Sequence, residues 1–167
     1  TIFVISFIEY QWNIGNYTEE QLMSDEKQER LDWAIQTCVD RGLRRTNAMR
    51  ELLKELISSK SPKTLADLIK SKRLDGICDR ATVFRLLGRL VEKGVVRRLG
   101  FHERAAYYAF SYPGECNDYL ICTDCGIIEP LDMKCPVESL QKEVMKNSGF
   151  SSLHHELEFF GQCPACA

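Results

Sequence analysis

The chain has 167 residues, 44% of them hydrophobic, which suffices for one medium-sized domain or two small ones with packed cores. The formal net charge of −2 is unevenly distributed, because residues 41–104 carry 17 Lys and Arg against 7 Asp and Glu. This basic segment suits a polyanion partner, and a solvated Lys-rich surface is the alternative. The apolar opening TIFVISFI is too short to cross a membrane and lacks the features of a secretory signal, so we expect a cytoplasmic protein with no membrane partner.

The first helical pattern lies just after residue 22. Met23 opens the stretch MSDEKQERLDWAIQ, a plausible natural start for a helical domain, so residues 1–22 are expected to be a translated leader outside the fold. Apolar side chains recur at helical spacing over residues 25–40, and Gly42 suits the end of such a helix. We therefore expect a helix over residues 25–40.

The next segments follow the order helix, short helix, turn, helix. Thr46 precedes NAMRELLKELISS with its apolar stripe, KTLADLIKSK is a short amphipathic segment, and Asp79 suits the N-cap of RATVFRLLGRLVEK. This order is typical of a helix-turn-helix. The β-rich runs VVRRLG and AAYYAF flank FHER and predict a two-stranded wing. We therefore predict a winged-helix DNA-binding domain over residues 23–110 and a hinge over residues 111–114.

The pattern changes again over residues 115–167. The runs DYLICT and GIIEPL predict paired strands, PVESLQKEVMKNSG predicts a helix, and HHELEFFG predicts a third strand. The apolar residues of that helix are expected to face inward, namely Val137, Leu140, Val144 and Met145. The predicted fold class is therefore α+β, with an N-terminal winged helix-turn-helix domain followed by a small α/β domain.

Four of the eight cysteines form two C-x-x-C pairs, Cys122 with Cys125 and Cys163 with Cys166. Two such knuckles can place four thiolates around one Zn²⁺, because the intervening strand, helix and strand return the chain to the first knuckle. Disulfides require an oxidising compartment, and a thioredoxin-like dithiol begins a helix instead of lying between strands. We therefore expect one structural Zn²⁺ per chain that stabilises residues 115–167.

Three segments carry a resemblance to a known family. The helix ATVFRLLGRLVEKGVV, the knuckle DYLICTDCG and the closing FFGQCPAC together resemble the ferric uptake regulator (Fur) family of metal-responsive bacterial repressors, over roughly residues 30–167. The resemblance implies a homodimer formed by the C-terminal domains, with winged helices that bind a palindromic double-stranded DNA operator. It also implies a regulatory divalent metal near the seam between the two domains.

The helix after Asp79 carries the expected DNA contacts. Its Arg and Thr side chains fall largely off the apolar face and can reach phosphates and guanine edges. The family motif TVYR has a DNA-contacting tyrosine, and Phe84 stands in its place, with packing into the core as the alternative. The expected contacts are Arg80, Thr82, Phe84, Arg85 and Arg89.

The sensing site departs from the family pattern. The histidine-rich string that precedes the first knuckle in the family is CNDY here, so a nitrogen-rich sensor cannot be rebuilt in full. By the resemblance, the remaining regulatory ligands are His102, Glu115, Cys116, Asp118 and His155. A set of Cys and His favours Zn²⁺ over Mn²⁺, although Zn²⁺, Fe²⁺ and Mn²⁺ all remain open. The thiols of Cys38, Cys78 and Cys135 are expected to be buried or incidental.

These observations predict a dimeric, zinc-stabilised transcriptional regulator, most simply a repressor. Two alternatives stay open. The chain can bind DNA without metal sensing or respond to oxidants through Cys116, or it can be a zinc-containing module that binds another protein. An enzyme with a small-molecule substrate is not expected, because a closed zinc site has no water position and the sequence offers no nucleophile–base pair or phosphate-binding glycine loop.

Overall fold

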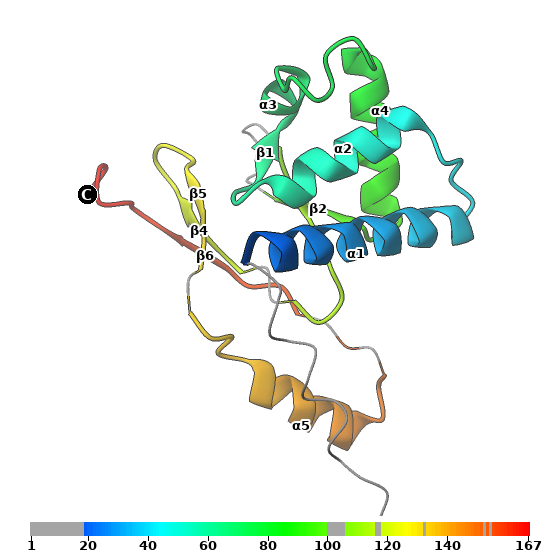
Figure 1. Ribbon diagram of the computed structural model, residues 1–167. Coiled ribbons are helices and arrows are strands. Elements are labelled where there is room, and N and C mark those ends of the chain that lie inside the picture. Colours follow the sequence, from blue (N-terminus) through cyan, green and yellow to red (C-terminus); the bar gives the residue numbers. More distant parts are fainter. Residues whose placement is uncertain (1–18, 100–105, 116–117, 132, 152, 154) are drawn as a thin grey trace, which may run out of the picture.

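The structure is a computed structural model that describes residues 19–99, 106–115, 118–131, 133–151, 153 and 155–167 (Figure 1). Its N-terminal elements are α1 (Glu19–Asp40), α2 (Asn47–Ser58), β1 (Lys63–Thr64), α3 (Leu65–Ile69), α4 (Arg80–Glu92), β2 (Val96–Leu99) and β3 (Tyr107–Phe110). Its C-terminal elements are β4 (Tyr119–Cys122), β5 (Ile128–Pro130), α5 (Glu138–Ser148) and β6 (Glu158–Gly161). The α+β class predicted from the sequence is confirmed.

Side-chain caps fix where the helices of the N-terminal part begin. The Thr46 hydroxyl accepts the Met49 N–H at 3.2 Å at the start of α2, and Asp79 Oδ1 accepts the Thr82 N–H at 2.7 Å at the start of α4. Each cap satisfies an N–H group that has no partner within the helix, and such a cap contributes about 1 kcal/mol to helix stability. The turn between α3 and α4 therefore ends at a defined residue, which sets the direction of α4.

One hydrophobic core holds α1, α2, α3 and α4 together and covers the first sheet. Leu52, Leu53, Leu68, Leu87 and Leu90 have no exposed side-chain surface within it. The sheet has the order β1-β3-β2 with antiparallel pairing, and Val96 lies opposite Phe110. The predicted tip of the wing, FHER, lies outside the described residues.

The first helix begins earlier than the predicted residue 25. Helix α1 begins at Glu19, so the helix runs through Met23 without a break. The expected leader falls mainly on residues 1–18, which lie outside the described residues. Among the described residues, no helix combines the length and apolar character that crossing a bilayer requires.

The second sheet has the order β5-β4-β6, with β4 antiparallel to β5 and parallel to β6. Figure 1 shows α5 standing away from this sheet and from the N-terminal helices. The prediction that the apolar side of α5 faces inward was wrong for this single chain, because α5 has no buried residue and Leu140 and Val144 are 55% and 39% exposed. The amphipathic pattern of α5 therefore has no partner surface within the described part of the chain.

Candidate metal centres and nucleic-acid interface

The two cysteine knuckles meet where β4 and β6 end side by side. The parallel register pairs Cys122 with Gly161, which brings the second knuckle next to the first. The Sγ atoms of Cys122, Cys125, Cys163 and Cys166 all lie within 4.8 Å of one another. The Cys125 and Cys163 sulfurs are 3.7 Å apart, and thiolates bound to tetrahedral Zn²⁺ at about 2.3 Å lie about 3.8 Å apart. The arrangement therefore fits a closed four-sulfur zinc site.

The thiols of this cluster have opposed pKa shifts. Backbone N–H groups, that of Cys125 first and that of Cys163 second, lower the pKa of Cys122 to about 6. The neighbouring Cys163 and Cys125 side chains raise the pKa of Cys166 to about 12. The Cys122 thiolate is thus stabilised by the knuckle itself, whereas the raised pKa of Cys166 favours its thiol form unless a cation compensates the negative charge.

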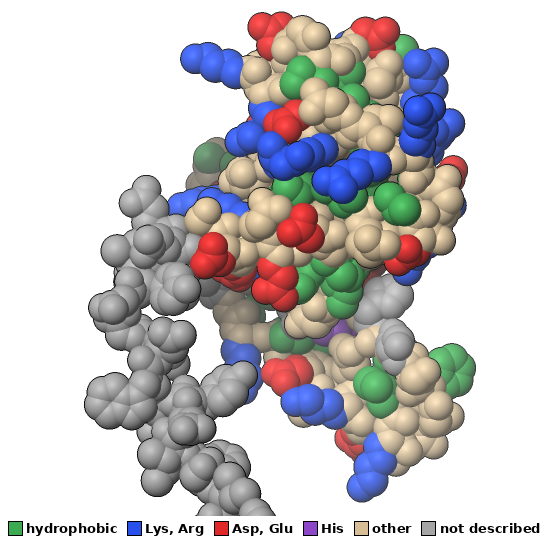
Figure 2. All heavy atoms as spheres, turned by 45° about the vertical axis from the view of Figure 1, so that its right-hand side comes forward, with side chains coloured by type: hydrophobic (Ala, Val, Ile, Leu, Met, Phe, Trp, Pro, Cys, Tyr) green, Lys and Arg blue, Asp and Glu red, His purple; other side chains and the backbone are tan. Residues whose placement is uncertain are grey.

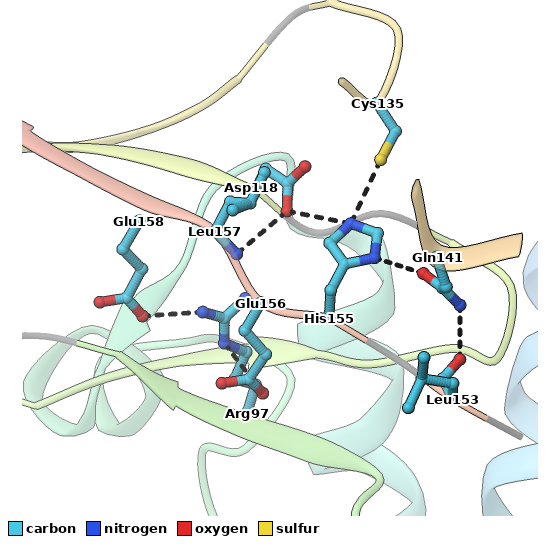
Figure 3. Close-up of polar contacts among 9 residues, drawn as sticks. All are labelled: Arg97, Asp118, Cys135, Gln141, Leu153, His155, Glu156, Leu157 and Glu158. Carbon is cyan, nitrogen blue, oxygen red and sulfur yellow. Dashed lines mark hydrogen bonds and ion pairs between the residues drawn. The ribbon is translucent and has the colours of Figure 1, made fainter. Parts of the chain in front are cut away.

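A second group of potential ligands lies at the other end of the C-terminal sheet, where Asp118 precedes β4 and His155 precedes β6 (Figure 3). The donor atoms of Asp118, Cys135 and His155 lie within 4.8 Å of one another. Cys135 Sγ is 3.2 Å from His155 Nε2, and that nitrogen is 3.9 Å from Asp118 Oδ1. One sulfur, one nitrogen and one oxygen form a mixed donor set that suits a borderline-soft divalent metal. We name Asp118, Cys135 and His155 the seam cluster.

Among the described residues, Asp118 is the one charged residue that is buried, with 6% of its surface exposed. Its Oδ1 accepts the Leu157 N–H at 3.3 Å, which links the carboxylate to the strand that follows His155. Among the described residues, no Lys or Arg forms an ion pair with Asp118. A buried carboxylate is costly without a nearby positive charge, and a metal ion held by the seam cluster would supply that charge.

The structure brings together only some of the predicted regulatory ligands. Asp118 and His155 meet in the seam cluster, whereas the Glu115 carboxylate pairs with Arg30 of α1 at 2.7 Å. His102 and Cys116 lie outside the described residues. Cys135, expected from the sequence to be buried or incidental, is instead half-buried and lies with Asp118 and His155 in the seam cluster. The sequence offers one signal, because Cys135 lies in the connection between a predicted strand and the helix predicted to start at Pro136.

Helix α4 presents a polar face to solvent. Arg80, Arg85 and Arg89 are exposed, while Val83, Leu87 and Leu90 of the same helix are buried. Phe84 is 58% exposed, so its alternative role as a core residue is wrong. In Figure 2, Lys and Arg side chains gather over the upper part of the molecule, where α3 and α4 lie in Figure 1. The geometry offers guanidinium donors and one aromatic ring to a groove of DNA.

Arg97 joins the first sheet to the seam. Its guanidinium lies 2.8 Å from Glu158 Oε1 and 3.4 Å from Glu156 Oε1, and only 9% of the side chain is exposed (Figure 3). It also lies over the ring of Tyr119, 5.8 Å from the ring centroid. A residue of the wing sheet is thus held by residues that neighbour two seam ligands.

Comparisons with known proteins agree with these features. Residues 40–160 match the sequence model of the ferric uptake regulator family. The chain is 30% identical over 129 residues to a ferric uptake regulation protein of Legionella pneumophila, covering 76% of this chain and 93% of that protein. It is 28% identical over 141 residues to the peroxide operon regulator of Bacillus subtilis, covering 82% and 93%. The fold is similar to that of the Helicobacter pylori ferric uptake regulator, with a TM-score of 0.60, 24% identity and coverage of 85% and 92%.

Proposed function

The chain belongs to the ferric uptake regulator family, whose members are metal-responsive transcriptional regulators and not enzymes, and from this premise we propose that it is a dimeric, zinc-stabilised repressor with a divergent regulatory site. Proteins of this family bind DNA operators, typically as dimers. The single observation that carries the regulatory part of the proposal is the buried carboxylate of Asp118, which faces His155 and has no Lys or Arg partner among the described residues.

The proposed DNA-reading element is α4. It is held by its buried apolar face and its Asp79 cap, so its exposed side can enter the major groove without refolding. In this proposal the helix contacts the operator through Arg80, Thr82, Phe84, Arg85 and Arg89. Arginines contact phosphates and guanine edges, and the Phe84 ring contacts a thymine methyl. Operator affinity should fall steeply with added salt, because counterions are released from the phosphates.

The proposed dimer forms through the C-terminal part. The β5-β4-β6 sheet and the turn before β5 expose Leu120, Ile127, Phe159 and Phe160, each between 42% and 49% exposed. Leu120 and Phe159 are register partners and share one face of the sheet, whereas Phe160 lies on the other face. Helix α5 adds Leu140, Val144 and the nearby Phe150 without burying them. Exposed apolar side chains of this number are typical of an interaction surface. A second copy that covers them would place two α4 helices on the half-sites of a palindromic operator.

The two metal centres have different proposed roles. The four-cysteine site is closed, so its Zn²⁺ stabilises the C-terminal fold. The seam cluster supplies three protein ligands and leaves a position for a further ligand, which suits an ion that binds reversibly. Zn²⁺ is the proposed ion there, ahead of Fe²⁺ and Mn²⁺, because one of its ligands is a thiolate. Binding at the seam would favour the spacing of α4 helices that fits the operator.

The test is a Zn²⁺ titration of the reduced chain followed by operator selection with and without added metal. The proposal expects two zinc ions per chain, one resistant to mild chelation, and tighter operator binding when the second is bound. One tight zinc with DNA affinity indifferent to further metal would exclude metal sensing. The 3.2 Å contact between Cys135 and His155 favours thiol oxidation as the second candidate signal, so the same selection is run after peroxide.

A further inference from the structure

The side chain of Gln141 connects α5 to the seam cluster. Its amide Nε2 donates to the Leu153 carbonyl oxygen at 2.5 Å, and its Oε1 lies 2.5 Å from His155 Nδ1 (Figure 3). Gln141 is half-buried in a helix that has no fully buried side chain. It therefore ties the segment that carries His155 to an otherwise loosely packed helix.

These two contacts determine where the imidazole proton lies. The Leu153 carbonyl can only accept a hydrogen bond, so the NH₂ end of the amide must face it and the oxygen end must face the ring. An amide oxygen cannot donate, so Nδ1 of His155 must carry the hydrogen of that bond. In the neutral ring Nε2 is then unprotonated, and its lone pair points to Cys135 Sγ and Asp118 Oδ1.

We propose that Gln141 is the positioning residue of the seam cluster: it holds His155 as the Nδ1–H tautomer and thereby makes Nε2 the metal-binding nitrogen. The proposal rests on the proposed function where it treats the cluster as a metal site. Histidine ligands generally donate their second N–H to an acceptor that fixes the ring, and loss of such an acceptor weakens metal binding by about 10- to 100-fold.

The tautomer can be observed directly, because the chain has only 3 histidines. Long-range ¹H–¹⁵N spectra of the full chain, after removal of weakly held metal by mild chelation, should show His155 with a protonated Nδ1 and an unprotonated Nε2. The Gln141→Glu variant keeps an acceptor oxygen and should keep this tautomer, whereas Gln141→Leu should lose it. A wild-type His155 that carries its proton on Nε2 overturns the proposal.

Zinc affinity of the seam site, measured against a fluorescent chelator, supplies the second readout. Gln141→Leu should weaken Zn²⁺ binding by about 10- to 100-fold, and Gln141→Glu should restore affinity to the wild-type level or better. The matched control is Gln36→Leu, which removes an exposed glutamine that contacts Asp40 on α1 and should leave the affinity unchanged. Wild-type affinity in Gln141→Leu overturns the positioning role, and if that variant does not fold, the wild-type and Gln141→Glu spectra decide. A wild-type chain that binds no second zinc contradicts the proposed function instead, and the tautomer spectrum still tests Gln141.

Discussion

Arg97 of β2 donates a hydrogen bond to Glu158 of β6 at 2.8 Å, so a side chain of the wing sheet is anchored in the sheet that carries the metal ligands. Its partners also include Glu156 and the ring of Tyr119. Glu156 directly follows one seam ligand along the chain and Tyr119 directly follows another. Under the proposed function, a movement of either ligand on metal binding would pass across one peptide bond to its chain neighbour, which contacts Arg97.

The first prediction concerns this contact. Arg97→Gln should leave zinc binding at the seam nearly unchanged but reduce the gain in operator affinity that zinc produces, because the wing sheet no longer follows the ligands. The free energy of unfolding should fall by about 1–3 kcal/mol, since Glu158 loses a charged hydrogen-bond partner. Fluorescence anisotropy on an operator duplex, with and without zinc, measures the gain, and urea unfolding measures the stability.

Arg98→Gln is the matched control for Arg97. Arg98 is the next residue of β2, has the same charge and is exposed. Its loss can lower operator affinity, but it should do so by the same factor with and without zinc. If Arg97→Gln keeps the wild-type ratio of the two affinities, Arg97 has no part in the coupling.

Most helices and strands of the fold could be predicted from the sequence, because the signals that define them are local. Thr46 and Asp79 are good N-cap residues, and the structure starts α2 and α4 directly after them. The alternation of the C-terminal strands and the two knuckles likewise indicated a sheet closed by four sulfurs. Such patterns depend on neighbours along the chain, which a sequence records.

Two features could not be predicted from the sequence, the exposure of the apolar side of α5 and the place of Cys135 beside His155. Both depend on contacts with residues that are distant along the chain or belong to another copy. Leu140 and Val144 follow a helical pattern, but nothing in one chain states whether their partner is the same subunit or a second copy. Cys135 becomes a potential ligand only because the chain between β5 and α5 passes beside His155. The course of the folded chain decides which residues meet, and the local spacing of residues does not encode that course.

The second prediction concerns the reading helix. Arg85→Ala should weaken operator binding by about 1–3 kcal/mol, or roughly 5- to 150-fold, while changing the free energy of unfolding by less than about 0.5 kcal/mol because the side chain is exposed. Phe84→Ala should also weaken binding, whereas Phe84→Tyr should preserve it, since the ring is 58% exposed and has room for a hydroxyl. Lys146→Ala, on α5, is the control for a lost positive charge. Unaltered operator binding by Arg85→Ala and Phe84→Ala would contradict the assignment of α4 as the reading helix.

The third prediction is a pH dependence at the start of α3. The Thr64 hydroxyl and N–H donate to the Asp67 carboxylate and hold its pKa below the usual value. A carboxyl group whose pKa is lower in the folded state stabilises the fold above its unfolded pKa of about 3.9, and this stabilisation is lost as the pH falls through the folded pKa. Asp67→Asn should therefore reduce the loss of unfolding free energy below about pH 4. Asp75→Asn, an exposed aspartate outside the helix caps, should not; equal acid profiles of the wild type and Asp67→Asn would contradict the assignment.

The fourth prediction separates a regulatory ligand from an incidental thiol. Cys135→Ser should weaken zinc binding at the seam about tenfold or more, because a hydroxyl is a poor substitute for a thiolate, whereas Cys78→Ser should leave both zinc sites intact. Cys135→Asp keeps a charged ligand but replaces sulfur with oxygen, so the ratio of Mn²⁺ to Zn²⁺ affinity should rise relative to the wild type. Competition titrations with both ions measure this ratio. If both Cys135 variants bind zinc as the wild type does, Cys135 is not a ligand, and two protein ligands alone are too few for a selective site. The metal-responsive role would then have to be sought at the other predicted ligands, and the close contact of Cys135 with His155 would point to oxidation as the signal read at the seam.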